Sequence, residues 1–100
     1  MAILAIFTGK GITRDMYEAL RKEVNWEGDQ PAGGIFHAMG LDEEGHLHVA
    51  DVWASPEQMD AFVQQRLLPG MQKHNVPPPD VAVYPLYNAN AYKAIEQYRI

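Results

Sequence analysis

Cysteine is absent from this 100-residue chain. A chain without cysteine has no disulfide framework, no thiolate zinc site and no cysteine nucleophile, and this composition predicts a cytoplasmic location. The sequence also lacks an apolar run long enough to cross a membrane, and its N-terminal segment has no basic region of the kind found in secretion signals. We therefore expect neither a membrane partner nor a targeting segment, and the apolar residues 1–7 are interpreted as the beginning of a strand.

Basic residues are few and are not clustered. Eight Lys and Arg stand against thirteen Asp and Glu, giving a formal net charge of −5, so a nucleic-acid partner is not expected. The chain also contains no P-loop, no nucleophile elbow, no H-E-x-x-H pair and no dinucleotide-binding fingerprint. What it does contain is 47% apolar residues, in a chain long enough for one core. Residues 1–100 are therefore predicted to form one domain with little interior of its own, which favours an oligomer.

Hydrophobic periodicity predicts the element order βαββαβ. One helix begins after Thr13, a suitable N-cap, and a second begins at Ser55, where Ser-Pro-Glu-Gln forms a capping box with proline at the first helical position. Pro69 is expected to kink or split the second helix before His74. The predicted strands are residues 2–8, 34–41, 46–54 and 81–87, and residues 88–100 form a C-terminal arm with a marginal helix.

This order is that of the ferredoxin-like split-βαβ arrangement, an α+β fold in which a four-stranded antiparallel sheet carries both helices on one face. Three of the predicted strands are apolar at both alternating sets of positions, so the second face of the sheet must also be covered. Two copies packed sheet to sheet meet this requirement, and we therefore predict a homodimer. The phenols expected at its interface are Tyr84, Tyr87, Tyr92 and Tyr98.

The segment from Asp51 to Phe62, DVWASPEQMDAF, is the most distinctive stretch of the chain. Its acidic residue, tryptophan and serine at a strand end, followed by an acidic helix start, resemble a motif common in the dimeric α/β-barrel superfamily. Within that superfamily the chain is similar to the antibiotic-biosynthesis-monooxygenase-like group, over nearly its whole length. The resemblance implies a homodimeric α/β barrel with a pocket for a small hydrophobic ligand between helices and sheet. Members include cofactor-independent oxygenases, haem-degrading enzymes, isomerases and proteins without a known role, so the fold alone selects no function.

Two branches of this resemblance imply different site residues. In the haem-degrading branch an Asn on the first strand acts with a Trp and a His on the second helix. This chain has no Asn in that strand, Phe62 at the aromatic position, and His74 at or beyond the helix end. In the oxygenase branch an Asn and a Trp on the third strand act with an Arg or a Tyr. Trp53 and Arg66 match the Trp and the Arg, whereas no Asn occupies the expected place.

The register of the predicted hairpin decides which side chains share a face of the sheet. A hairpin centred on a four-residue turn, Asp42–Gly45, pairs Phe36 with Asp51. This register places His37 and Asp51 on opposite faces. A bulge near Gly40 would change part of the assignment.

Two residues are candidates for proton transfer. His37 lies in the middle of an apolar strand, where a neutral imidazole suits a general base or an iron ligand; a core histidine satisfied by one hydrogen bond is an equally good interpretation. Asp51 lies between two apolar residues and beside Trp53, and a partly desolvated carboxylate suits proton abstraction. The alternative for Asp51 is a structural ion pair with Arg66, Lys10 or an arginine of a partner subunit.

The remaining candidates are expected to bind a substrate. Trp53 and Phe62 are placed to stack on a ring and Tyr17 to line the same cavity, although all three also suit a plain core. Arg66 or His74 is expected to steady a developing negative charge, and a histidine at a helix C-terminus is equally explained by the helix dipole. Two strand histidines without a third ligand do not make a metal site, so no metal is predicted.

These residues predict a small enzyme of the cofactor-independent monooxygenase or isomerase type. Its substrate is expected to be a hydrophobic cyclic or aromatic carbonyl or enol, with His37 or Asp51 as the base. One alternative is a haem or hydrophobic-ligand binding protein that uses His37 or His74 as axial ligand. The other is a dimeric accessory protein without chemistry.

Overall fold

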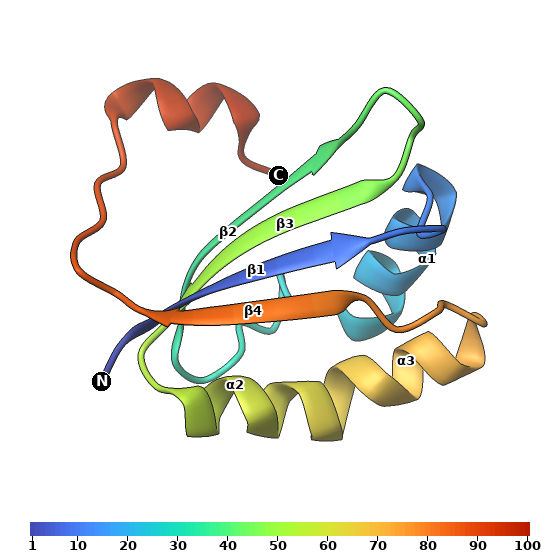
Figure 1. Cartoon of the computed structure of the whole chain (residues 1–100), viewed down its shortest axis with the longest axis horizontal. Coiled ribbons are helices and arrows are strands. Elements are labelled where there is room, and N and C mark those ends of the chain that lie inside the picture. The colour runs from blue at the N-terminus through green and yellow to red at the C-terminus, as the bar shows by residue number, and fades with distance from the viewer.

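A computed structural model describes residues 1–100, and Figure 1 shows a sheet with its helices on one side and a C-terminal arm that leaves the last strand. The predicted order of elements is confirmed, with a short 3₁₀ helix in the arm. The elements are β1 (Ile3–Gly9), α1 (Arg14–Val24), β2 (Gly34–Leu41), β3 (Leu47–Trp53), α2 (Pro56–Phe62), the π-helix η1 (Val63–Leu67), α3 (Leu68–Lys73), β4 (Asp80–Pro85) and the 3₁₀ helix η2 (Lys93–Tyr98).

The sheet is antiparallel throughout, with the strand order β2-β3-β1-β4. Because the helices of the domain lie on one face of this sheet, the architecture is the ferredoxin-like α+β fold expected from the sequence. None of the helices has the length and apolar character needed to span a membrane.

Both helix starts form as the sequence predicts. The Thr13 hydroxyl oxygen accepts a hydrogen bond from the Met16 N–H at 3.3 Å, and the Ser55 hydroxyl oxygen accepts one from the Gln58 N–H at 3.2 Å. The Ser55 hydroxyl also donates to the Gln58 side-chain oxygen at 3.1 Å. Each cap satisfies an N–H group of the first turn that has no partner within its helix, and this fixes where α1 and α2 begin.

Pro69 does not split the second helical segment, so of the expected kink or split the split does not occur. The segment continues from Pro56 to Lys73, with one wider π-helical turn, η1, ahead of the proline. Here the Leu68 N–H bonds the Val63 carbonyl, five residues back. Proline has no N–H and its ring crowds the carbonyl four residues earlier, so a wider turn allows the helix to continue.

The turn between β2 and β3 is one residue longer than predicted. Leu41 pairs with Leu47, so the connection comprises residues 42–46. Asp42 holds this turn, because its Oδ1 accepts hydrogen bonds from two backbone N–H groups of the turn at 3.0 and 2.9 Å. Gly45 adopts a φ of +81°, a conformation that favours glycine. The hydrogen bonds of the Asp42 side chain thus stabilise a five-residue turn, and this turn shifts the strand pairing by one residue from the register predicted for a four-residue turn.

The corrected register places His37 directly opposite Asp51. Directly opposed residues of an antiparallel pair share a face, so the expectation that these two lie on opposite faces is wrong. The strand pair does contain a bulge, but it lies at Ile35 rather than near Gly40.

The core fills the space between the sheet and the helices. α1 and α3 approach closely at Gly70, where an added Cβ would lie 3.0 Å from Val24 Cγ2 and 3.1 Å from Leu20 Cδ1. Glycine at this position therefore sets the helix spacing. The buried cluster consists of Ile3, Ala5, Phe7, Ile12, Tyr17, Leu20, Val24, Leu47, Val49, Trp53, Met59, Met71 and Val76.

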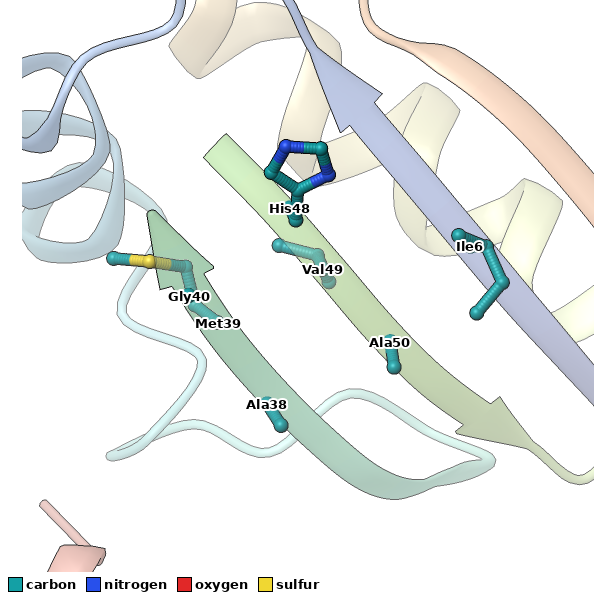
Figure 2. Close-up of a pocket in the computed structure, with 7 residues that line it drawn as sticks. All are labelled: Ile6, Ala38, Met39, Gly40, His48, Val49 and Ala50. Atoms are coloured by element: carbon teal, nitrogen blue, oxygen red, sulfur yellow. The ribbon is translucent and has the colours of Figure 1, made fainter. Parts of the chain in front are cut away.

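The opposite face of the sheet carries no helix, and we call it the open face (Figure 1). Ile6 and Ala38 flank Ala50 at its centre, on the two strands paired with β3. With His48 these three side chains line an open hollow of about 350 Å³. Figure 2 shows the lining residues on their three strands. The open face is therefore apolar at its centre and has no cover within one chain.

The C-terminal arm, residues 88–100, also exposes apolar and aromatic side chains to solvent. Tyr92 and Tyr98 are 77% and 79% exposed, and Ile100 is 77% exposed. Tyr87, where the arm leaves the sheet, is 98% exposed. Aromatic side chains extended into solvent are typical of a surface that packs against another molecule.

Candidate functional site

His37 and Asp51 form the centre of the candidate site. His37 Nδ1 lies 2.7 Å from Asp51 Oδ1, and both side chains come from directly opposed positions on β2 and β3. The Asp51 side chain is only 12% exposed, whereas that of His37 is 35% exposed. A buried carboxylate thus orients an imidazole that remains within reach of a ligand, which is how a general base is held in many enzymes.

Tyr17 extends this pair to three residues, which we call the triad. Its hydroxyl, carried by α1, lies 2.8 Å from His37 Nε2, and the two rings are almost coplanar, with an interplanar angle of 4°. The tautomer that satisfies all three groups has its proton on Nδ1, donated to Asp51, and Nε2 accepting the Tyr17 hydroxyl proton. The triad is therefore a continuous chain of hydrogen bonds from a buried carboxylate to a phenol.

Trp53 hydrogen-bonds the second oxygen of the Asp51 carboxylate. Its indole N–H donates to Asp51 Oδ2 at 3.3 Å, and the residue is 4% exposed. Asp51 therefore accepts one hydrogen bond on each oxygen, and its partners are His37 and Trp53 rather than the Arg66 or Lys10 of the ion-pair alternative. Because the Trp53 N–H bonds Oδ2 of Asp51, Oδ1 is the oxygen that accepts from His37.

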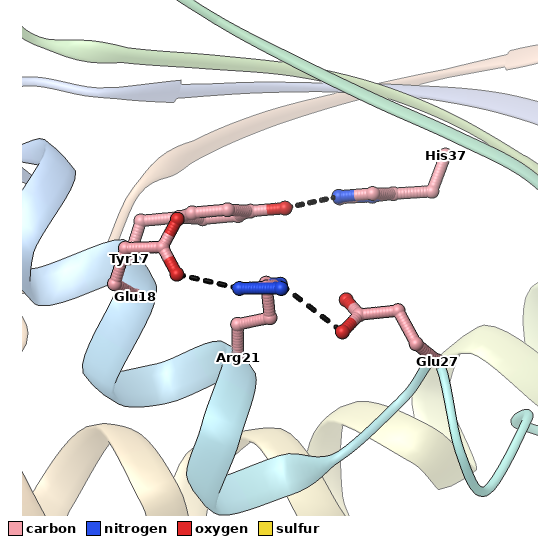
Figure 3. A network of polar contacts seen from close by, with 5 residues as sticks. All are labelled: Tyr17, Glu18, Arg21, Glu27 and His37. Carbon is pink, nitrogen blue, oxygen red and sulfur yellow. Dashed lines mark hydrogen bonds and ion pairs between the residues drawn. The ribbon is translucent and has the colours of Figure 1, made fainter. Parts of the chain in front are cut away.

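Charged side chains lie beside Tyr17, as Figure 3 shows. Arg21 lies between two carboxylates, with its Nη1 at 2.5 Å from Glu18 and its Nε at 3.0 Å from Glu27. Burial raises the pKa of Tyr17 to about 12; the negative charge of Glu27 adds to this rise and Arg21 opposes it. The Tyr17 phenol therefore remains a hydrogen-bond donor at neutral pH.

The raised pKa of Tyr17 predicts a loss of stability in alkaline solution. A tyrosine in the unfolded chain ionises near pH 10 and folded Tyr17 near pH 12, so the unfolded state loses its proton first as the pH rises. The contribution of this group to the free energy of unfolding is complete below pH 10 and is lost between pH 10 and 12. We expect the urea midpoint of the wild type to fall relative to that of Tyr17→Phe across this window. A constant difference between the two proteins up to pH 12 would contradict the assignment.

Trp26 is a site residue that sequence analysis missed. Its ring centroid lies 5.5 Å from that of His37 and 5.7 Å from that of Tyr17, at tilts of 57° and 54°. The indole nitrogen is buried and has no hydrogen-bond partner. The available signal was a single large apolar side chain in an otherwise polar loop, residues 25–33, with its glycines and proline.

Phe62 and Arg66 lie beside the triad rather than within it. Phe62 packs against Trp53, with ring centroids 5.4 Å apart, and the Arg66 guanidinium lies 5.2 Å from the Phe62 ring centroid. One Arg66 nitrogen donates to the carbonyl oxygens of Val24 and Asp29 at 3.0 and 2.7 Å, which ties the helical segment to the loop. Both side chains also line a polar hollow of about 310 Å³.

The two histidines considered as haem ligands, His37 and His74, are both hydrogen-bonded to other side chains. Both ring nitrogens of His37 are hydrogen-bonded, so neither is free for iron unless the bond to Tyr17 or Asp51 breaks. His74 lies outside the triad and bonds Glu23 of α1 at 3.2 Å. No group of three or more His, Cys, Asp and Glu side chains is arranged to hold a metal ion. The present hydrogen bonds thus fit proton transfer better than metal ligation.

Solved structures with the same fold include a candidate antibiotic biosynthesis monooxygenase from Chloroflexus aurantiacus, with a TM-score of 0.66 and 14% identity over 91% of this chain and 98% of that one. A Mycobacterium tuberculosis protein matches with a TM-score of 0.60 and 19% identity over 89% and 97% of the two chains. SnoaB, a cofactor-independent oxygenase from Streptomyces nogalater, matches with a TM-score of 0.57 and 14% identity over 88% and 93%. No protein-family model and no curated protein matches the sequence. The resemblance carried by residues 51–62 is therefore confirmed as a likeness to the antibiotic-biosynthesis-monooxygenase-like fold.

Proposed function

We propose that this protein is a small cofactor-independent oxygenase that removes a proton from a hydrophobic cyclic or aromatic carbonyl compound, or from its enol or phenol form. The observation that carries this proposal is the hydrogen-bonded triad of Tyr17, His37 and Asp51, with bonds of 2.8 and 2.7 Å. Support also comes from the fold, which SnoaB, a cofactor-independent oxygenase, shares. The aromatic surroundings of the triad, Trp26 and Trp53, suit a planar apolar substrate.

Proton transfer follows the order of the triad. The substrate gives up a proton, from the carbon beside its carbonyl or from the hydroxyl of its enol, to the Tyr17 oxygen while the Tyr17 proton moves to His37 Nε2. The resulting imidazolium is stabilised by the Asp51 carboxylate on its other nitrogen. The net result is a substrate anion and a protonated His37, with Tyr17 unchanged.

Oxygen completes the reaction without a further reductant. The enolate carbon forms a C–O bond with O₂ and gives a peroxide anion, which takes the proton held by His37. Loss of the remaining hydrogen on that carbon, together with the departing hydroxide, leaves a new C=O group and one water. The substrate CH₂ group is oxidised by four electrons and O₂ is reduced by four, so the step balances. Without O₂, return of the proton to a different carbon gives an isomerisation at the same site.

The experiment uses 2-tetralone, an enolisable bicyclic ketone, as the probe. Under anaerobic conditions in deuterated buffer we expect the protein to accelerate hydrogen exchange beside the carbonyl, measured by NMR. In air we expect consumption of O₂ and incorporation of one labelled oxygen atom from ¹⁸O₂, measured by mass spectrometry. Exchange without O₂ uptake supports the isomerase type instead. No acceleration of exchange over an Asp51→Asn variant overturns the proposal.

We also propose that two copies of the chain pair through their open faces. The support is the apolar centre of that face, around Ile6 and Ala50, and the exposed aromatic arm of residues 88–100. Pairing covers the open face and gives the arm a surface on the partner. The helix-covered face that carries the triad stays outside this contact.

A further inference from the structure

The indole N–H of Trp26 is the only buried side-chain nitrogen or oxygen in the chain without a hydrogen-bond partner. Buried polar groups in folded proteins are nearly always paired, and an exception calls for a ligand, a bound water or a functional reason. Trp53, the other tryptophan, is fully used, because its N–H donates to Asp51. The indole N–H of Trp53 is therefore hydrogen-bonded, whereas the indole N–H of Trp26 is free to donate to a ligand.

The ring that carries this unused donor packs against two residues of the triad. The Trp26 ring packs at 5.5 Å from the His37 ring and at 5.7 Å from the Tyr17 ring, measured between centroids, so it contacts the two residues that exchange the proton. A substrate hydroxyl must reach the Tyr17 oxygen to give up its proton, so the ring that carries the donor neighbours the position of that hydroxyl. Negative charge develops on that hydroxyl oxygen when the proton leaves.

The loop that carries Trp26 is held in place by two arginines. Arg21 bonds Glu27, the next residue in the loop, at 3.0 Å, and Arg66 donates to the Asp29 carbonyl at 2.7 Å. A donor fixed before the substrate binds needs little reorganisation when charge appears, and this makes it effective at stabilising an anion. Both arginines are engaged in these contacts with the loop and its surroundings, whereas the buried indole N–H has no partner.

We propose that the Trp26 N–H donates a hydrogen bond to the substrate oxygen that Tyr17 and His37 deprotonate, and so stabilises the oxyanion. This inference rests on the proposed function, and it narrows the substrate class to compounds whose ionising oxygen is attached to a planar ring. Trp26 thereby acts on the charge of the bound ligand, whereas the triad removes its proton.

The test measures the ionisation of a bound ligand and does not depend on turnover. The probe is 7-hydroxycoumarin, whose phenol and phenolate absorb at different wavelengths, under anaerobic conditions. A hydrogen bond from a buried donor to a charged oxygen favours the anion, and we expect the ratio of bound phenolate to bound phenol to fall about 10- to 100-fold in Trp26→Phe. Coumarin, which lacks the hydroxyl, controls for lost packing and is expected to bind both proteins equally.

A second variant separates the N–H from the shape of the ring. Replacing Trp26 by benzothienylalanine keeps the bicyclic ring and removes only the donor, so it should lower the phenolate ratio as much as Trp26→Phe does. An unchanged ratio in both variants overturns the inference, as does failure of the wild type to bind 7-hydroxycoumarin. If O₂ uptake is absent but the ratio still falls, the oxygenase proposal fails and the role of Trp26 stands. If O₂ uptake occurs and the ratio is unchanged, only the role of Trp26 fails.

Discussion

Asp51→Asn is expected to lower turnover by about 10³- to 10⁴-fold, the size of loss that a wrong imidazole tautomer causes in a serine protease triad. The Trp53 N–H requires an acceptor, so the Asn oxygen turns toward Trp53 and its NH₂ group toward His37. The amide then donates to His37 Nδ1, which moves the ring proton to Nε2. In that tautomer His37 cannot accept the proton of Tyr17.

A second substitution tests this reasoning directly. In the double variant Asp51→Asn with Trp53→Phe, the Asn no longer has an indole to satisfy and is free to present its oxygen to His37. We expect the double variant to recover part of the lost activity relative to Asp51→Asn, measured as 2-tetralone exchange per folded protein. Circular dichroism provides the check that each variant is folded. Activity in Asp51→Asn within threefold of the wild type, or a double variant no better than Asp51→Asn, would rule out the tautomer argument.

Ala50→Arg is expected to convert the proposed homodimer into a monomer. Ala50 lies at the centre of the open face, opposite Ile6 on β1 and Ala38 on β2. Pairing two such faces would bury two unpaired guanidinium groups, and the cost of removing them from water is several kcal/mol. We therefore expect the dimer dissociation constant to rise at least about 100-fold, measured by sedimentation velocity.

A matched variant places the same charge on the other side of the molecule. Gln64→Arg lies at an exposed position of the helical layer and is expected to leave the dimer intact. Deleting residues 88–100 tests the arm separately and should weaken the dimer without unfolding the domain. A wild-type protein that sediments as a monomer at micromolar concentration would refute the pairing outright.

Most of the fold was predictable because its signals are local. The caps at Thr13 and Ser55 are formed by residues within three positions of each other, and their hydrogen bonds are those expected. The hairpin register was not predictable from loop length, because it depends on the side chain of Asp42 bonding two backbone N–H groups of the turn. A shift of one residue reverses which side chains share a face, so this single turn decided whether His37 meets Asp51.

The candidate residues were predictable as types, but their contacts were not. His37 and Asp51 were each identified as a possible base. The structure shows that they are hydrogen-bonded to each other, so they belong to one site and are not alternatives. Tyr17 was expected only to line a cavity, because its contact with His37 depends on how α1 packs against β2. The packing of Trp26 against His37 and Tyr17 could not be inferred from periodicity, since residues 25–33 have none.

The central claim is that the triad removes a proton from the substrate, and one comparison tests it most directly. Tyr17→Phe removes only the hydroxyl that contacts His37, and Tyr87→Phe removes a hydroxyl from a residue that is 98% exposed. We predict that anaerobic exchange of 2-tetralone falls about 100-fold in Tyr17→Phe, within the range that a positioned acid or base contributes, and is unchanged in Tyr87→Phe. Equal exchange rates in the two folded variants would contradict the claim.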